Sequence, residues 1–378
     1  MKLRNLAFTS CFLLLITFIC MTEIPASQIP ATVSTESTSA ETSDMIDEPS
    51  TPLASTPAPI IARLGFVGDI NLDENWPTTQ FMNKQPHGIY DCISPNLISL
   101  CNSFDLFMLN NEFTYSKRGT PLPNKAYTFR ADPSRIQAIQ ALGTDIVLLA
   151  NNHIYDYGKD AFDDTLKTLQ KANIDYVGAG TNIDEAKNIV YQTIGNTKFA
   201  YVAATRAEKY KMTPEATSTS EGVLRCYDPS QYLETIKEAK ANSDYVIASI
   251  HWGTEYSNTA EQYQRDLGYA MIDAGADAVI GTHPHVLQGI EYYKNKPIMY
   301  SLGNFWFNEK DLYSCVTELN INTDTHALES LRFIPCIQKN CYTNWPSNNP
   351  TMCREIMDFE QKISFGIMID DNGLVTTK

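Results

Sequence analysis

The sequence lacks the features that mark several well-known functional classes. It contains no run of Lys or Arg residues, and its 44 acidic residues against 29 basic ones give a formal net charge of -15. A protein that binds the backbone of DNA or RNA needs clustered basic side chains to meet the phosphates. We therefore expect no nucleic-acid partner.

Paired cysteine motifs are also missing. None of the nine cysteines stands in a Cys-x-x-Cys arrangement, so a cysteine-based zinc or redox site has no support. Cys11 and Cys20 lie in an N-terminal apolar segment, and seven cysteines remain in the rest of the chain. We expect structural disulfides and buried thiols, with at least one thiol unpaired. The main source of disulfides would be the late cluster of Cys315, Cys336, Cys341 and Cys353.

Only one long apolar run is present, and it stands at the N-terminus. Lys2 and Arg4 are followed by sixteen uncharged, mostly apolar residues at 6–21. This length lies between a signal-peptide core and the roughly 17–25 residues of a membrane span. We predict export, with residues 1–21 acting as a cleaved signal peptide or as a retained membrane anchor. Residues 22–59 are rich in Ser, Thr, Pro and Glu, which predicts a disordered linker.

From residue 60 to 378, short apolar runs alternate with amphipathic stretches, which indicates one α/β domain with much parallel pairing. Expected strands are 61–67, 106–109, 146–150, 176–177, 199–203, 246–250, 278–280 and 298–302. Expected helices are 133–142, 159–172, 229–242 and 259–274. Three later strands, at 316–321, 328–337 and 363–370, would form a covering sheet.

Polar residues follow these apolar runs at the points where the strands should end. Ligands of α/β sheets bind outside the carboxyl ends of the strands. Four of the six histidines of the chain occupy such positions, and coincidence is the alternative interpretation. The residues concerned are Asp69, Glu112, Asn152, His153, His251, His283 and His285.

These residue types predict a metal site. Imidazole, carboxylate and carboxamide donors without thiolate suit Mn, Zn or Fe. There are more of them than one tetrahedral ion uses, which favours two divalent ions. Water bound to such an ion can reach a pKa of about 7 and become a nucleophile at neutral pH.

The motifs at these positions resemble those of the CapA family. They are residues 66–70, 110–112, 149–153 with 156–158, 178–182, 250–256, 275–285 and 300–305. The resemblance implies a calcineurin-like metallophosphoesterase fold, with a central β-sandwich flanked by helices. It also implies a bacterial protein that acts in the synthesis or export of poly-γ-glutamate, an anionic capsule polymer.

The resemblance implies a role for each site residue as well. The metal ligands would be Asp69, Glu112, Asn152, His251, His283 and His285. His153 would protonate the leaving group, with Asp156 orienting it or only stabilising a turn. Two positions depart from the family pattern: Asn71 stands where a His is usual, and Glu112 stands where an Asp is usual. A single-ion site is therefore the alternative to a two-ion site.

Three further residues are candidates for substrate binding. Arg130 and Arg206 could bind an anionic substrate or serve as surface ion-pair partners. Asn304 could line the site or end a strand.

Three functions are compatible with these observations. The first is a metal-dependent hydrolase that acts on an anionic polymer of the cell envelope, at the extracellular face of the membrane or in secreted form. The second is a non-catalytic accessory subunit of a membrane polymer synthase. The third is an extracellular phosphatase of small phosphoesters, because a fold does not fix a function.

Overall fold

The computed structural model describes residues 60–207 and 212–378. The predicted signal peptide or anchor and the predicted linker therefore lie outside the described residues. Among the described helices, none has the length and apolar character needed to cross a membrane.

The first of two large sheets has ten strands. Its main path runs in the order β19-β20-β17-β16-β1-β2-β5-β6, while β15 pairs with β1 and β18 pairs with β17. Strands β1, β2, β5 and β6 run parallel to one another. The bounds are β1 Ile61–Ile70, β2 Leu106–Asn111, β5 Ile146–Leu148, β6 Asp175–Val177, β15 Asn304–Trp306, β16 Leu312–Asn322, β17 Ala327–Lys339, β18 Tyr342–Asn344, β19 Ile367–Ile369 and β20 Leu374–Thr377.

The second large sheet has six strands in the order β13-β14-β12-β11-β9-β8, with β9, β11, β12 and β14 parallel. Its strands are β8 Val190–Ile194, β9 Thr197–Thr205, β11 Tyr245–His251, β12 Ala278–Thr282, β13 Leu287–Tyr293 and β14 Lys296–Leu302. Two small pairs join β3 Thr114–Tyr115 to β4 Arg130–Ala131 and β7 Ala179–Gly180 to β10 Gly222–Val223.

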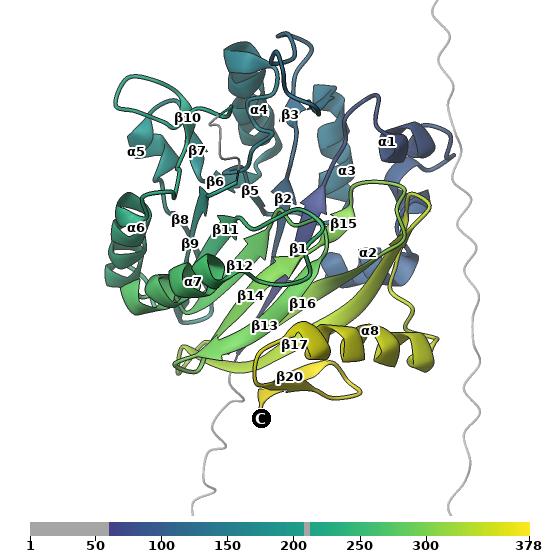
Figure 1. Ribbon diagram of the computed structural model, residues 1–378, viewed down its shortest axis with the longest axis vertical. Helices are drawn as coiled ribbons and strands as arrows, with labels where there is room; N and C mark the ends of the chain where they lie inside the picture. The colour runs from purple at the N-terminus through teal and green to yellow at the C-terminus, as the bar shows by residue number, and fades with distance from the viewer. Residues whose placement is uncertain (1–59, 208–211) are drawn as a thin grey trace, which may run out of the picture. The chain divides into compact units, whose positions relative to one another are not determined.

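The two large sheets pack face to face, and alternation along β9 shows how. Phe199 and Tyr201 belong to the core shared with β1, β2 and β5, whereas Ala200 and Val202 pack with residues of helices α6 and α7. Successive side chains of a strand point to opposite faces of its sheet, so one face of β9 looks into the sandwich and the other meets helices. The predicted α/β fold, a β-sandwich flanked by helices, is confirmed (Figure 1).

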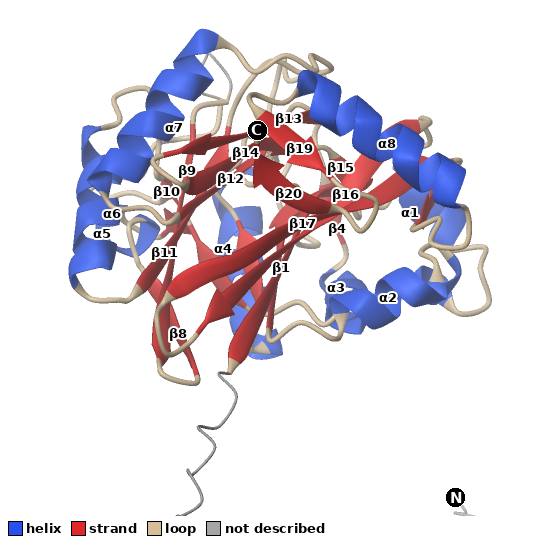
Figure 2. Ribbon diagram, turned by 90° about the horizontal axis from the view of Figure 1, so that it is seen from below, coloured by secondary structure: helices blue, strands red, loops and turns tan. Residues whose placement is uncertain are grey.

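The helices cover the outer surfaces of the sandwich. Figure 2 shows α6 and α7 on one side and α2 and α3 on the other, with α8 beyond them at the end formed by the C-terminal strands. The α-helices are α1 Pro77–Met82, α2 Pro95–Cys101, α3 Ile136–Ala141, α4 Gly158–Ala172, α5 Ile183–Ala186, α6 Ser230–Ala241, α7 Gln262–Ala274 and α8 Pro350–Ile363, and short 3-10 helices span Gly88–Asp91 and Pro133–Arg135. The four predicted helices correspond to α3, α4, α6 and α7.

The expectation of a separate covering sheet is wrong. Strands β16 and β17 extend the first sheet, because β16 pairs directly with β1 in antiparallel register from Ile61↔Asn322 to Phe66↔Thr317. The predicted strand at 363–370 is also too long. Ile363 ends helix α8, and only Ile367–Ile369 form β19.

The expected disulfides of the late cysteine cluster are absent as well. All seven cysteines of the described residues are free thiols. In the β16–β17 pair, Cys336 stands opposite Ser314 and Cys315 stands opposite Pro335. Because neighbouring residues of a strand point to opposite faces, Cys315 and Cys336 lie on different faces of the sheet and cannot bridge.

Candidate metal centre

The predicted site residues converge because both sheets end at the same place. Asp69 lies near the carboxyl end of β1, and Glu112 directly follows β2. His251 is the last residue of β11, and His283 directly follows β12 in the opposite sheet. The sandwich therefore brings side chains from four parallel strands to one edge, as the strand-end rule predicts.

Close backbone packing at Gly68 brings β1 against the turn that follows β14. A Cβ atom at Gly68 would lie 1.8 Å from the carbonyl oxygen of Gly303, so no larger residue fits there. The Asp69 N–H donates to the same carbonyl at 3.0 Å. This contact places Asn304 beside Asp69 in the β1–β15 pair.

Two groups of buried residues have the geometry of metal ligands, and they share Glu112. One consists of Glu112, His251 and His283, and the other of Asp69, Glu112 and His285. Within each group the ligand atoms lie within 4.8 Å of one another. Asn152 reaches the first group, because its Oδ1 lies 2.7 Å from His251 Nε2. The structure thus brings together all six predicted metal ligands.

Oxygen Oε1 of Glu112 lies among imidazoles without accepting a hydrogen bond. It is 3.5 Å from His251 Nε2, and 3.9 Å from both His285 Nε2 and His153 Nε2. These separations are too long for hydrogen bonds. Ligand atoms that each lie about 2.0–2.2 Å from one ion are separated from each other by about 3–4 Å. The spacing around Glu112 therefore fits a shared cation.

Unpaired buried atoms support the same interpretation. Glu112 Oε1 and His283 Nδ1 have no hydrogen-bond partner among the described residues, whereas Asp69 Oδ2 lies 3.2 Å from His285 Nδ1. Buried polar atoms are nearly always paired, and an exception calls for an explanation such as an ion. With carboxylate and imidazole as the donor types, a divalent cation of the Mn, Zn or Fe kind fits these residues.

The cluster has a closed floor and a narrow open side. Asp69, Glu112 and His251 are 0% exposed, whereas His153, Asn152, His283 and His285 are 5–6% exposed. The last four residues are therefore the ones through which solvent reaches the cluster.

Asn110 is a site residue that the sequence analysis missed. Its Nδ2 donates to Asp69 Oδ1 at 2.7 Å and to Glu112 Oε2 at 3.1 Å, so one amide connects the two carboxylates. Its Oδ1 accepts from Asn151 Nδ2 at 3.1 Å. The available signal was the Asn-Asn pair that ends β2 and the second Asn-Asn pair that follows β5.

The segment after β12 has an unusual backbone. His283 and His285 have φ values of 98° and 60°, in a region that residues with a Cβ rarely adopt. Residues with such a backbone persist only where the surrounding structure holds them, and they are frequent at binding sites. Asn304 helps to hold His285 in this backbone conformation, because its Oδ1 lies 2.9 Å from His285 Nδ1. Asn304 therefore contacts a predicted metal ligand, and its role in substrate binding stays a prediction.

Burial and neighbouring charges shift the protonation of the cluster. Burial, with the charge of nearby Asp69, raises the pKa of Glu112 well above its usual value. Burial also lowers the pKa values of His251 and His283 well below 6.5, so both imidazoles are uncharged at neutral pH, the form in which a histidine can bind a metal. Burial would lower the pKa of His285 too, but the hydrogen bond and charge of Asp69 outweigh it and raise that pKa.

His153 stands next to the cluster with a fixed orientation. Its Nδ1 lies 2.7 Å from Asp156 Oδ2, which also accepts the Phe129 N–H at 2.7 Å. A carboxylate that accepts a hydrogen bond from Nδ1–H keeps the proton on that nitrogen, and it directs Nε2 of the ring toward Glu112. The geometry supports the predicted orienting function of Asp156.

The two arginines make contacts outside the cluster. Arg130 donates to the carbonyl oxygens of Arg118 and Gly119 and stacks over the Tyr157 ring at 4.2 Å. Arg206 donates to the Tyr227 carbonyl at 3.2 Å and lies over the Tyr227 and Tyr263 rings. Their predicted contact with substrate stays a prediction.

Asn71, which stands where the resemblance led us to expect a His, is buried beside the cluster. Its Oδ1 accepts the Asp73 N–H at 2.8 Å, which stabilises the turn after β1.

A comparison with protein families covers the region of the chain that contains the predicted site residues. A family model described as bacterial capsule synthesis protein PGA_cap matches residues 63–309. The chain belongs to this family.

Similar members of the capsule synthesis family confirm the predicted resemblance to CapA. The capsule biosynthesis protein CapA of Bacillus anthracis is 39% identical over 197 residues, which cover 51% of this chain and 47% of that protein. The PGA biosynthesis protein CapA of Bacillus subtilis is 33% identical over 260 residues, which cover 68% and 67%. A Mycobacterium tuberculosis protein named as a probable polyglutamine synthesis accessory protein is 31% identical over 209 residues, which cover 53% and 55%. The chain thus spans about half the length of two of these relatives.

Solved structures with a similar chain path have low sequence identity. A phosphatase of Mycoplasma pneumoniae is 12% identical, with a TM-score of 0.48 over 75% of this chain and 96% of that chain. The NAD nucleotidase of Haemophilus influenzae is 10% identical, with a TM-score of 0.43 over 74% and 50%.

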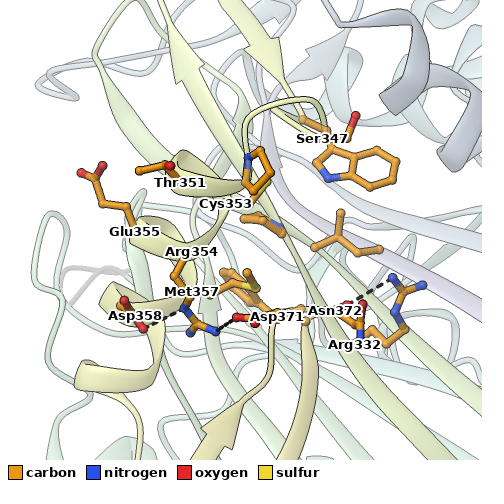
Figure 3. Close-up of a pocket in the computed structure, with 16 residues that line it drawn as sticks. Arg332, Ser347, Thr351, Cys353, Arg354, Glu355, Met357, Asp358, Asp371 and Asn372 are labelled. Carbon is orange, nitrogen blue, oxygen red and sulfur yellow. Dashed lines mark hydrogen bonds and ion pairs between the residues drawn. The ribbon is translucent and has the colours of Figure 1, made fainter.

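A separate pocket lies in the part of the chain that follows the family match. It is formed by β17, α8 and the turn before β20, and no metal-cluster residue lines it (Figure 3). Arg354 pairs there with Asp358 at 2.9 Å and with Asp371 at 3.3 Å, and Arg332 donates to the Asn372 carbonyl. Arg354 is thus paired within the pocket, whereas Arg332 pairs at 3.1 Å with Glu318, which does not line it.

Proposed function

We propose that this member of the capsule synthesis family is a metal-dependent hydrolase. It would cleave a phosphoester or amide bond in an anionic envelope polymer, such as poly-γ-glutamate. The observation that carries this proposal is the buried Glu112 Oε1, which faces imidazoles of both ligand groups without a hydrogen bond. Glu360 is another buried carboxyl with an unpaired oxygen, but it belongs to neither ligand group, so the proposal depends on the imidazoles that surround Glu112.

Two divalent ions held by these groups would supply an activated water near neutral pH and stabilise negative charge on the reacting oxygens. Asp69, Glu112 and His285 would hold one ion, and Glu112, Asn152, His251 and His283 the other. Asn110 keeps the two carboxylates side by side through its two donated hydrogen bonds.

His153 is the residue that would move a proton. Asp156 fixes the imidazole through Nδ1, and Nε2 lies at the slightly exposed side of the cluster, where substrate would arrive. From Nε2 the protonated ring can donate to the leaving oxygen or nitrogen. A general acid in this position typically contributes about 10²–10⁴-fold in rate.

We place this reaction outside the cytoplasm, with the protein anchored to the membrane or secreted. The apolar residues 6–21 after a basic start support that location. Subunits of a membrane polymer synthase would be its partners. Fractionation of cells into cytosol, membrane and medium tests the location.

A matched pair of histidine variants tests the hydrolase. The metal-loaded protein is assayed on an aryl phosphate and on a γ-glutamyl oligomer. We expect His153→Ala to lose at least about 100-fold in rate with its metal content unchanged. His87→Ala is the control, because the His87 side chain is 74% exposed and pairs only with Asp91 among the contacts described. Equal rates for the two variants would remove His153 from the mechanism, and no turnover by the wild type would favour a non-catalytic accessory protein.

A further inference from the structure

Lys125 is a buried lysine at the edge of the metal cluster. It lies in the loop that connects β3 to β4, and its side chain is only 5% exposed. A charged amine at such depth needs specific partners to offset its lost hydration. The site described so far gives this residue no role.

Two partners of Lys125 belong to the site. Its Nζ lies 2.7 Å from Asp156 Oδ1, and it also donates to the main-chain carbonyl of Asn152. Asp156 holds His153, and Asn152 is a metal ligand. One ammonium group therefore connects the residue that orients the acid with the backbone of a residue that binds the metal.

The loop makes further contacts with the same carboxylate residue. The Phe129 N–H donates to Asp156 Oδ2 at 2.7 Å, and the Leu122 N–H donates to the Asp156 carbonyl at 2.8 Å. The Phe129 ring lies 4.4 Å from the His153 ring, measured between centroids. Three residues of one loop thus hold Asp156 and the imidazole that it orients.

We infer that Lys125 is a positioning residue of this site: through Asp156 and the Asn152 carbonyl, it fixes the direction in which His153 points. The inference rests on the proposed function for the step that His153 performs. The contacts themselves do not depend on that step. Because Lys125 already pairs with Asp156, its effect reaches the reaction through His153 and not through the substrate.

The kinetic test compares Lys125→Met with Lys125→Arg and with a control in the same loop, Lys117→Met. The Lys117 side chain is 73% exposed and pairs with Asp132 at 2.9 Å, so it has no contact with the cluster. We expect Lys125→Met to lower kcat about 10–100-fold, as loss of an orienting partner does, with KM within about twofold. Lys125→Arg should recover part of the loss, and Lys117→Met should resemble the wild type.

A double mutant separates positioning from general destabilisation. In a His153→Ala background, Lys125→Met should have almost no further effect on kcat, because the residue that it positions is gone. The inference would be overturned if Lys125→Met lowered kcat by the same factor in both backgrounds, or if Lys117→Met lowered kcat as much as Lys125→Met.

A spectroscopic measurement keeps the inference testable without turnover. In the metal-free full-length protein, the NMR signal of the proton on His153 Nδ1 is identified by its absence in His153→Ala. We expect this signal to shift or to exchange faster with water in Lys125→Met, but to stay unchanged in Lys117→Met. An unchanged signal in Lys125→Met would contradict the inference. A shifted signal in a protein that has no hydrolase activity would support the positioning role of Lys125 and reject only the proposed function.

Discussion

Replacing Glu112 by Gln should make the metal-free protein more stable and abolish its stabilisation by metal. The substitution keeps the size of the side chain and removes its charge. Glu112 is 0% exposed, and burial together with the charge of Asp69 raises its pKa well above 4.5. Ionised Glu112 is therefore a source of instability when no cation is bound.

The sign and size of the effect follow from proton linkage. As pH rises above about 4.3, the unfolded chain releases the Glu112 proton before the folded protein does, so the stability of the wild type falls. Glutamine has no proton to release. Glu112→Gln should therefore equal the wild type near pH 4 and exceed it at pH 8 by about 1–4 kcal/mol, the gain in stability found when buried ion pairs are replaced by uncharged residues of similar volume.

Bound metal should make the wild type more stable than Glu112→Gln, the reverse of their order without metal. A divalent ion at 100 times its Kd stabilises a folded protein by about 2.7 kcal/mol. The wild type should gain at least this amount, while Glu112→Gln should gain little, because it lacks the ligand shared by both groups.

The assay is urea unfolding at pH 4 to 8, with chelator or with Mn²⁺. Glu360→Gln is a matched control, because Glu360 on α8 is also buried with a raised pKa and belongs to neither ligand group. It should share the gain in stability at high pH and keep the full response to metal. A metal response in Glu112→Gln as large as in Glu360→Gln would refute the assignment of Glu112 as a ligand.

Three further predictions concern other residues. Burial lowers the pKa of His283, so below about pH 6.5 only the unfolded chain takes up its proton and the wild type loses stability. In urea unfolding with chelator, the stability of His283→Gln relative to the wild type should therefore rise from pH 8 to pH 5. A stability difference that does not change with pH would argue against this prediction. Asn110→Asp should destabilise the metal-free protein by about 3–5 kcal/mol in the same assay, because it places a third carboxylate 2.7 Å from Asp69 Oδ1. An unchanged free energy of unfolding would show that the Asn110 amide does not connect the carboxylates of Asp69 and Glu112. Alkylation in denaturant without reductant should modify all seven cysteines from Cys92 to Cys353, and protection of any two until reduction would reveal a disulfide.

The convergence of the proposed metal ligands could be predicted from the sequence because a simple rule links chain position to space. Parallel strands deliver the residues that follow them to one edge, so Asp69, Glu112 and His251 could be grouped without a structure. Asn110 follows the same rule, but its role as a bridge depends on the distance between two carboxylates. No spacing in the sequence encodes that distance.

The remaining features depend on contacts that periodicity does not describe. Lys125 stands in an irregular loop and reaches Asn152, which is 27 positions away in the chain. The separation of the thiols of Cys315 and Cys336 follows from the β16–β17 register, which the sequence leaves open. Helix α8 did have a readable start, since Asn349 caps it through Met352 N and Pro350 follows.

The most direct test of the account is anomalous scattering from crystals of the protein grown or soaked with Mn²⁺ and measured at the manganese edge. We predict two peaks about 3.5–4 Å apart on either side of the Glu112 carboxylate, one beside His251 and His283 and the other beside Asp69 and His285. No peak within bonding distance of Glu112 at saturating metal would contradict the account.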